Sequence, residues 1–269
     1  MAHRCTGGDP QPRRLSVTGT WVVDLDGVVW LADRPIPGSV EAVARARAAG
    51  VRLLFVTNNS SLTVEEYLDK LAGMSIPTVA ADLVTSAQAA AGLLPAGSSA
   101  VLCAGAGVRQ ALGERGVEIR PAGPADTVVV GWHRDFDFDG LANACRAVWG
   151  GARLVATNAD ATYPTPDGLL PGAGSILAAV EKATGVKAEV AGKPEPPVVA
   201  LLKERAQGPV ALVVGDRLDT DGLLAQRLGV PFALVLSGVS KQEPGPGQPP
   251  AAHVEPDLAH LVAALVGSR

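Results

Sequence analysis

The sequence places carboxylates directly after apolar, strand-like runs. In "WVVDLDGVVW" such a run ends on Asp24, and Asp26 follows two residues later. A later run, "ALVVGD", ends on Asp216, and Asp221 follows it in the same motif. Carboxylates held this close repel one another, and an oxygen-only cluster is the donor set that Mg²⁺ prefers and Zn²⁺ does not. These four residues therefore predict a divalent-cation site.

Polar side chains suited to phosphate follow the same pattern. The run "LLFVTNN" ends on Thr57, Asn58 and Asn59, and "AGKPEP" supplies the cation of Lys193. Each has a simpler interpretation by itself, because such a loop often caps a helix and a lysine is mostly a solvated surface charge. In open parallel sheets, however, ligands bind at the carboxyl ends of the strands. We therefore expect these side chains to converge with the aspartates.

The elements that must position these residues form an alternating series of strands and helices. The helix after Thr63 is marked most clearly, since Thr63 and Glu66 form a capping box ahead of an apolar stripe. This alternation predicts an α/β fold with a doubly wound, Rossmann-like parallel sheet. The apolar strand runs lie at 21–23, 51–56, 83–86, 100–104, 127–131, 152–157, 210–214 and 232–236.

Composition narrows the function classes. The formal net charge is −4, which leaves no basic surface for a nucleic acid polymer, and no run approaches the roughly 20 apolar residues of a membrane span. Cys5, Cys103 and Cys145 contain no CxxC pattern, which favours reduced thiols and a cytoplasmic location. Residues 1–19 lack the apolar core of a signal peptide and predict a disordered tail.

Taken together and in this order, "DLDGVV", "VTNN", "GKPEP" and "GDRLDTD" resemble the four motifs of the haloacid dehalogenase superfamily. The motif sequences most resemble those of its p-nitrophenylphosphatase and phosphoglycolate phosphatase branch, to which "TNADATYPTPDGLLPGAG" is also similar. Two positions depart from that branch. Ala159 stands where proline is common, and Gly222 stands where an aliphatic residue is usual.

The spacing of the motifs predicts where a second domain is inserted. Between Asp24 and Thr57 there is room for one crossover helix and one strand only. The interval from Thr57 to Lys193 is long enough for a whole α/β domain. We therefore expect a cap at 88–187, between motifs two and three, and a catalytic core made of 20–87 and 188–269.

The resemblance implies a Mg²⁺-dependent phosphatase of small phosphorylated metabolites, such as 2-phosphoglycolate, glycerol phosphate or p-nitrophenyl phosphate. It makes Asp24 the nucleophile that forms an aspartyl-phosphate, and Asp26 the general acid and then base. Asp24, Asp216 and the backbone carbonyl of Asp26 would hold the metal, supported by Asp221. The residues expected to bind the phosphoryl oxygens are Thr57, Asn58, Asn59 and Lys193. A homodimer through the cap is also expected.

We expect the cap loop "TNADATYPTPDG" to recognise the leaving group, because the core motifs contact only phosphate. Pro164 and Pro166 restrict its backbone, so it can present one side chain in a fixed place. Tyr163 offers an aromatic face and a hydroxyl, and it is the residue expected to do so. The alternative is that Tyr163 only packs inside the cap.

Other functions are compatible with parts of the pattern. A nucleotide or pyridoxal-phosphate phosphatase of the same branch and a non-enzymatic phosphate-binding relative both keep the motifs. A phosphate-accepting receiver domain also clusters aspartates, but such modules have roughly half this length. "CAGAGVRQAL" imitates a dinucleotide-binding loop, yet Gln110 stands where the third glycine belongs. His133 and Arg134 receive no role.

Overall fold

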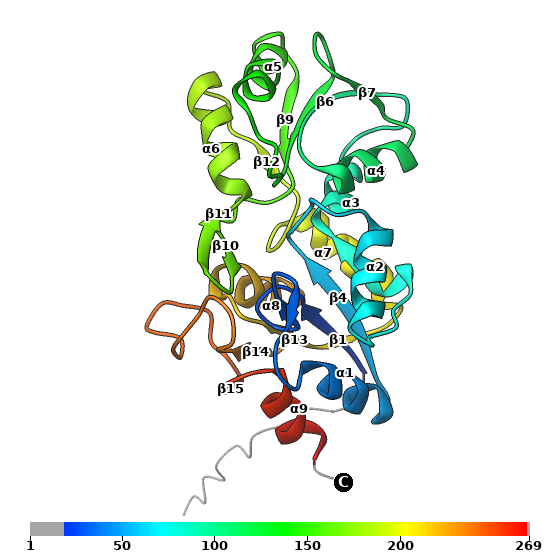
Figure 1. Cartoon of the computed structure of the whole chain (residues 1–269), viewed down its shortest axis with the longest axis vertical. Helices are drawn as coiled ribbons and strands as arrows, with labels where there is room; N and C mark the ends of the chain where they lie inside the picture. Colours follow the sequence, from blue (N-terminus) through cyan, green and yellow to red (C-terminus); the bar gives the residue numbers. More distant parts are fainter. Residues whose placement is uncertain (1–18, 268–269) are drawn as a thin grey trace, which may run out of the picture.

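The computed structural model describes residues 19–267, which form two parallel sheets, one above the other in Figure 1. The expected tail, residues 1–19, lies outside the described residues except for Gly19, which begins the first strand. Among residues 19–267, no helix is long and apolar enough to cross a membrane.

The lower sheet has six parallel strands in the order β15-β14-β13-β1-β4-β5. In register, Val23 of β1 lies opposite both Val214 of β13 and Phe55 of β4. The three central strands therefore end at one edge. The strand bounds are β1 (Gly19–Asp24), β4 (Val51–Thr57), β5 (Leu83–Thr85), β13 (Val210–Gly215), β14 (Phe232–Val235) and β15 (His253–Glu255).

Helices cover both faces of this sheet, as its buried strands require. Val22 packs on one face and its neighbours Trp21 and Val23 pack on the other. One face carries α3 (Ser86–Ala91), α7 (Pro196–Ala206) and α8 (Leu223–Leu228). The other carries α1 (Ser39–Ala48), α2 (Val64–Gly73) and α9 (Leu258–Val266). This confirms the doubly wound fold, and the capping box of Thr63 and Glu66 is formed at the start of α2.

The upper sheet is the inserted cap, with five parallel strands in the order β12-β9-β8-β6-β7. We expected the cap to end at residue 187. Strand β12 lies beyond that residue but belongs to the cap sheet, because it pairs with β9. The bounds are β6 (Ser99–Cys103), β7 (Glu118–Arg120), β8 (Thr127–Val130), β9 (Arg153–Ala156) and β12 (Glu189–Val190). One face packs on α4 (Ala106–Glu114), and the other on α5 (Phe138–Trp149) and α6 (Ala173–Thr184).

The segment that we expected to be a cap loop is an antiparallel hairpin, β10 (Thr162–Thr165) and β11 (Gly168–Pro171). Pro166 and Asp167 form its two-residue turn, and Gly168 follows at φ 119. In Figure 1 the hairpin reaches from the cap toward the core. Short elements complete the chain: β2 (Trp30–Leu31), β3 (Arg34–Pro35), the 3₁₀ turn η1 (Ala80–Asp82) and the π-helical turn η2 (Leu218–Gly222).

Candidate active site

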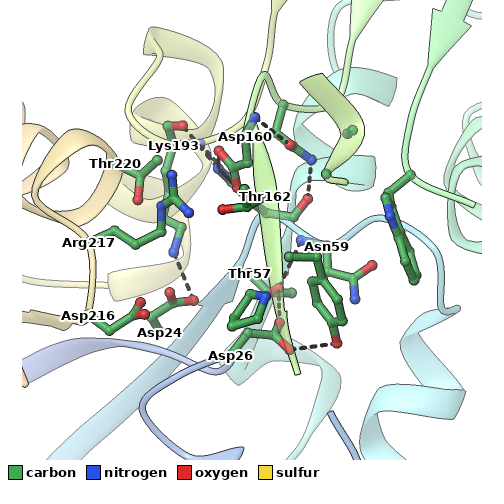
Figure 2. Close-up of a pocket in the computed structure, with 17 residues that line it drawn as sticks. Asp24, Asp26, Thr57, Asn59, Asp160, Thr162, Lys193, Asp216, Arg217 and Thr220 are labelled. Atoms are coloured by element: carbon green, nitrogen blue, oxygen red, sulfur yellow. Dashed lines mark hydrogen bonds and ion pairs between the residues drawn. The ribbon is translucent and has the colours of Figure 1, made fainter. Parts of the chain in front are cut away.

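The predicted site residues meet at the carboxyl edge of the core sheet. Asp24 is the last residue of β1, Thr57 is the last residue of β4, and Asp216 directly follows β13. Together with Asp26 and Lys193 they line one cavity, to which the cap contributes Asp160 and Thr162 (Figure 2). The parallel strands therefore bring together side chains that are far apart in the sequence.

Lys193 lies between two carboxylates. Its Nζ is 2.8 Å from Oδ1 of Asp24 and 2.7 Å from Oδ1 of Asp221, and the lysine is buried. Burial by itself would lower the pKa of Lys193, but the attraction of Asp221 and Asp24 outweighs it and raises the pKa. The ammonium therefore stays charged beside the expected nucleophile, where a phosphoryl group would need a cation.

Three buried carboxylates form a cluster that fits a divalent cation. One oxygen each of Asp24, Asp216 and Asp221 lies within 4.8 Å of the others. Oδ1 of Asp216 is buried and has no hydrogen-bond partner among the described residues. Burial first, then the charge of Asp221, raises the pKa of Asp216 to about 7. Burial likewise raises the pKa of Asp24 well above its usual value. A bound Mg²⁺ would offset this repulsion and occupy the unpaired oxygen.

A glycine makes room for this cluster. Gly27 has φ 87, and a Cβ there would lie only 2.4 Å from Oδ2 of Asp216. We expected Asp221 to support the metal ligands; its carboxylate lies in the same cluster as Asp24 and Asp216 and contacts Lys193, and its role stays a prediction. The expected contribution of Asp26 is its backbone carbonyl, and that stays a prediction.

The carboxylate of Asp26 faces the cap. Its Oδ1 accepts hydrogen bonds of 3.0 Å from Nε1 of Trp30 and 3.0 Å from the hydroxyl of Tyr163. Its Oδ2 accepts a hydrogen bond of 3.3 Å from Oγ1 of Thr57. These donors fix the carboxylate at the wall of the cavity, between the phosphate residues and the cap hairpin, as a general acid requires.

Asn58 has a different environment from the one we expected. Its Nδ2 donates to both carboxylate oxygens of Asp160, at 3.0 and 3.1 Å, and to the carbonyl of Lys193 at 3.1 Å. Its Oδ1 accepts from the backbone N–H of Lys193 at 2.7 Å. Because both polar atoms are engaged, Asn58 holds Lys193 in place, and its contact with phosphate stays a prediction.

Asn59 is engaged within its own loop. Its Oδ1 accepts hydrogen bonds from the backbone N–H of Ser61, at 3.0 Å, and from the Ser61 hydroxyl, at 2.7 Å. Its backbone carbonyl accepts from the hydroxyl of Tyr67 at 2.8 Å. The side chain therefore stabilises the turn after β4, and its expected binding of phosphate also stays a prediction.

Several residues that line the cavity were not predicted from the sequence, among them Asp160, Arg217 and Trp132. Arg217 lies inside "GDRLDTD" and Asp160 inside "TNAD", so both motifs contained the signal, but local sequence does not say which way their side chains point. The ring of Trp132 lies 4.9 Å from that of Tyr163, centroid to centroid. Trp132 thereby supports the residue expected to contact the leaving group.

Two stretches of the chain match known protein families. Residues 21–118 match the family described as haloacid dehalogenase-like hydrolase, and residues 190–261 match the family described as HAD-hydrolase-like. The chain is 42% identical over 229 residues to a D-glycerol 3-phosphate phosphatase of Mycobacterium tuberculosis, covering 81% of this chain and 63% of that relative. It therefore spans less than two thirds of that relative's length. It is 34% identical to the 5'-nucleotidase YutF of Bacillus subtilis, covering 83% of this chain and 89% of the relative.

Two solved structures are similar over most of the chain. The glycerol phosphate phosphatase of Mycobacterium tuberculosis in complex with magnesium has a TM-score of 0.82 and 34% identity, covering 93% of this chain and 78% of that one. The p-nitrophenyl phosphatase from Archaeoglobus fulgidus has a TM-score of 0.83 and 28% identity, covering 92% of this chain and 99% of that one.

Proposed function

The chain belongs to the haloacid dehalogenase-like hydrolase family, and on that premise we propose that it is a Mg²⁺-dependent phosphatase of small phosphomonoesters. One observation carries the proposal: Nζ of Lys193 lies 2.8 Å from Oδ1 of Asp24, beside a buried carboxylate cluster. The expected nucleophile Asp24, the ammonium of Lys193 and the candidate metal site are thus adjacent at the carboxyl edge of the core sheet. The whole arrangement suits phosphoryl transfer.

In the proposed reaction a carboxylate oxygen of Asp24 attacks phosphorus, and the bond from phosphorus to the ester oxygen breaks. Asp26 gives its proton to the leaving oxygen and then takes a proton from the water that hydrolyses the aspartyl-phosphate. That water releases inorganic phosphate and restores Asp24. Lys193 and Thr57 bind the phosphoryl oxygens. Asn58 holds the backbone of Lys193 and Asn59 stabilises the turn after β4, next to the same site.

The metal would be held by Asp24 and Asp216, with Asp221 in the same cluster and the carbonyl of Asp26 beside them. When bound, Mg²⁺ supplies positive charge that offsets the negative charge on the phosphoryl oxygens. The magnesium complex of a similar phosphatase supports this choice of ion.

The test is multiple-turnover release of phosphate at fixed enzyme and Mg²⁺ concentrations. The panel contains glycerol phosphate, 2-phosphoglycolate, nucleoside monophosphates, pyridoxal phosphate and p-nitrophenyl phosphate, ranked by kcat/KM. The Asp24→Asn variant controls for contaminating phosphatase. Release from none of these substrates would overturn the proposal in favour of a phosphate-binding protein.

The oligomeric state and location also belong to this proposal. Exposed apolar side chains at the two ends of α5, Phe138 at 79% and Trp149 at 63% exposure, support a homodimer through the cap. Light scattering of the wild type and of a Phe138→Ser, Trp149→Ser double variant tests it.

Cys103 and Cys145 are buried, free thiols, which support the proposed cytoplasmic location.

A further inference from the structure

A buried tryptophan contacts the expected general acid from the core. The backbone N–H of Gly27 donates to the carbonyl of Trp30 at 2.7 Å, and the N–H of Trp30 donates to the carbonyl of Leu25 at 3.2 Å, so the chain turns back on itself. In this turn Nε1 of Trp30 donates a hydrogen bond of 3.0 Å to Oδ1 of Asp26. The indole is 0% exposed, and an indole N–H can only donate. Oδ1 of Asp26 is therefore an acceptor toward Trp30.

Helix α2 holds the indole of Trp30 in place. The ring of Trp30 stacks on that of Tyr67, with centroids 6.5 Å apart and an angle of 11° between the planes. Nζ of Lys70 lies 4.3 Å from the centroid of the Trp30 ring. The same Nζ donates to the carbonyl of Ala32 at 2.6 Å, in the turn between β2 and β3. Contacts within the core therefore fix the direction of the indole N–H before a substrate binds.

The two carboxylate oxygens of Asp26 have different surroundings. Oδ1 accepts from both Trp30 and the hydroxyl of Tyr163, so two donors engage its two lone pairs. Oδ2 accepts only the longer hydrogen bond, of 3.3 Å, from Oγ1 of Thr57. Thr57 is a residue expected to bind the phosphoryl group, and Figure 2 shows it next to Asp26. Oδ2 is thus the oxygen with room for a proton, and it lies on the side of the phosphate site.

We infer that Trp30 is a positioning residue for the acid step: its indole keeps Oδ1 of Asp26 as an acceptor, so that Oδ2 carries the proton to the leaving oxygen. This inference rests on the proposed phosphatase function and adds a residue to it. As the bond from phosphorus to the ester oxygen breaks, that oxygen takes the proton from Oδ2, and Oδ2 keeps the electron pair of its O–H bond. Trp30 acts in this step only through Asp26.

The test uses three esters whose leaving oxygens are increasingly basic: p-nitrophenyl phosphate, phenyl phosphate and glycerol 3-phosphate. Trp30→Phe removes the N–H and keeps a ring against Tyr67. It should lower kcat/KM about tenfold or more for glycerol 3-phosphate and less than about threefold for p-nitrophenyl phosphate, with phenyl phosphate between them, because only a basic leaving oxygen needs the proton. The value of kcat/KM is compared because it covers only the steps up to departure of the alcohol.

Two further variants separate positioning from packing. Trp21→Phe is the matched control, because Trp21 is buried in the same apolar cluster as Trp30, and any loss that it causes should be equal on the three esters. In the Asp26→Asn background, Trp30→Phe should lower kcat/KM for glycerol 3-phosphate by less than about twofold more, since the two residues act as one unit. Thermal unfolding of each variant shows whether it is folded.

Three outcomes would overturn the inference. Wild-type values of kcat/KM in Trp30→Phe would remove any role in the acid step. Equal losses on the three esters would make Trp30 a packing residue. A full additional loss when Trp30→Phe is combined with Asp26→Asn would show that Trp30 acts by another route.

A second readout does not depend on turnover. The chain has four tryptophans, and the indole N–H signal of Trp30 in a heteronuclear NMR spectrum is identified by its loss in Trp30→Phe. That signal should shift in Asp26→Asn more than the other indole signals, because a carboxylate is a stronger acceptor than an amide. An unmoved signal would also overturn the inference. Absence of wild-type turnover on every substrate would overturn the proposed function and the inference with it, whereas turnover with equal losses overturns the inference alone.

Discussion

The hydroxyl of Tyr163, on the cap hairpin, donates a hydrogen bond of 3.0 Å to Oδ1 of Asp26, which lies two residues after the end of the core strand β1. Burial, followed by the nearby charge of Asp26, raises the pKa of Tyr163, so the phenol remains a donor at neutral pH. A cap residue thus contacts the expected general acid. In the proposed reaction Asp26 protonates the leaving oxygen, so Tyr163 is expected to lie near the organic part of the substrate.

Tyr163→Ala should therefore change substrate preference. We expect the ratio of kcat/KM values for two substrates with different leaving groups to shift by about tenfold or more, equivalent to about 1.4 kcal/mol, with little change in melting temperature. Tyr163→Phe, which keeps the ring against Trp132, is the matched control for the hydroxyl. An unchanged ratio with a lowered melting temperature would make Tyr163 a packing residue.

Asp24→Asn should abolish turnover without unfolding the protein. Asparagine keeps the shape of the side chain but is a poor nucleophile, so we expect a loss of at least about a thousandfold in kcat. Lys193 keeps its contact with Asp221, and one repulsive charge is removed, so the melting temperature should not fall. Near-wild-type rates would refute the covalent route.

Asp26→Asn should discriminate between leaving groups. Alkyl phosphates need a proton on the departing oxygen, whereas the phenolate of p-nitrophenyl phosphate needs little protonation. We expect kcat to fall much further for an alkyl phosphate than for p-nitrophenyl phosphate. The two substrates are measured side by side in the same preparation, and equal losses would argue against an acid role.

Removal of the metal should be fully reversible. The acceptor-only cluster of Asp24, Asp216 and Asp221 predicts that EDTA abolishes activity and that Mg²⁺ restores it. Ca²⁺ should inhibit, because it takes more ligands and loosens the geometry of attack. Activity is followed by phosphate release after dialysis. Full activity in excess EDTA would exclude the metal assignment.

The unusual glycine of the fourth motif should be required for stability. A Cβ on Gly222 would lie 2.9 Å from Cβ of Pro249, in the loop before β15. Introducing the aliphatic residue usual in this family, as in Gly222→Leu, should lower the free energy of unfolding by about 1–3 kcal/mol, as overpacking does. Gly208→Ala, with no neighbour within 4 Å of its Cβ, is the control in urea unfolding. Equal stabilities of Gly222→Leu and the wild type would contradict this.

The sequence by itself determined the features that depend on neighbouring residues. Strand-forming runs that end in Asp24 and Thr57 mark the carboxyl edge wherever a parallel sheet forms, and the Thr63–Glu66 capping box marks the start of α2. The family and the α/β fold follow from such motifs, and the relatives confirm both. The same motifs are the basis for proposing the phosphatase class and Mg²⁺. The family and the fold could be predicted because each motif is contiguous.

Only the tertiary structure decided how the cap meets the core. The contact between Tyr163 and Asp26 joins residues 137 positions apart, and that between Asn58 and Asp160 joins residues 102 apart. No local periodicity encodes such pairs, so the hairpin, the engagement of Asn58 and the inward direction of Arg217 were not predicted. The cap boundary was misplaced for the same reason, because β12 becomes a cap strand only by pairing with β9. Local sequence specifies elements, whereas side-chain partners depend on how those elements pack.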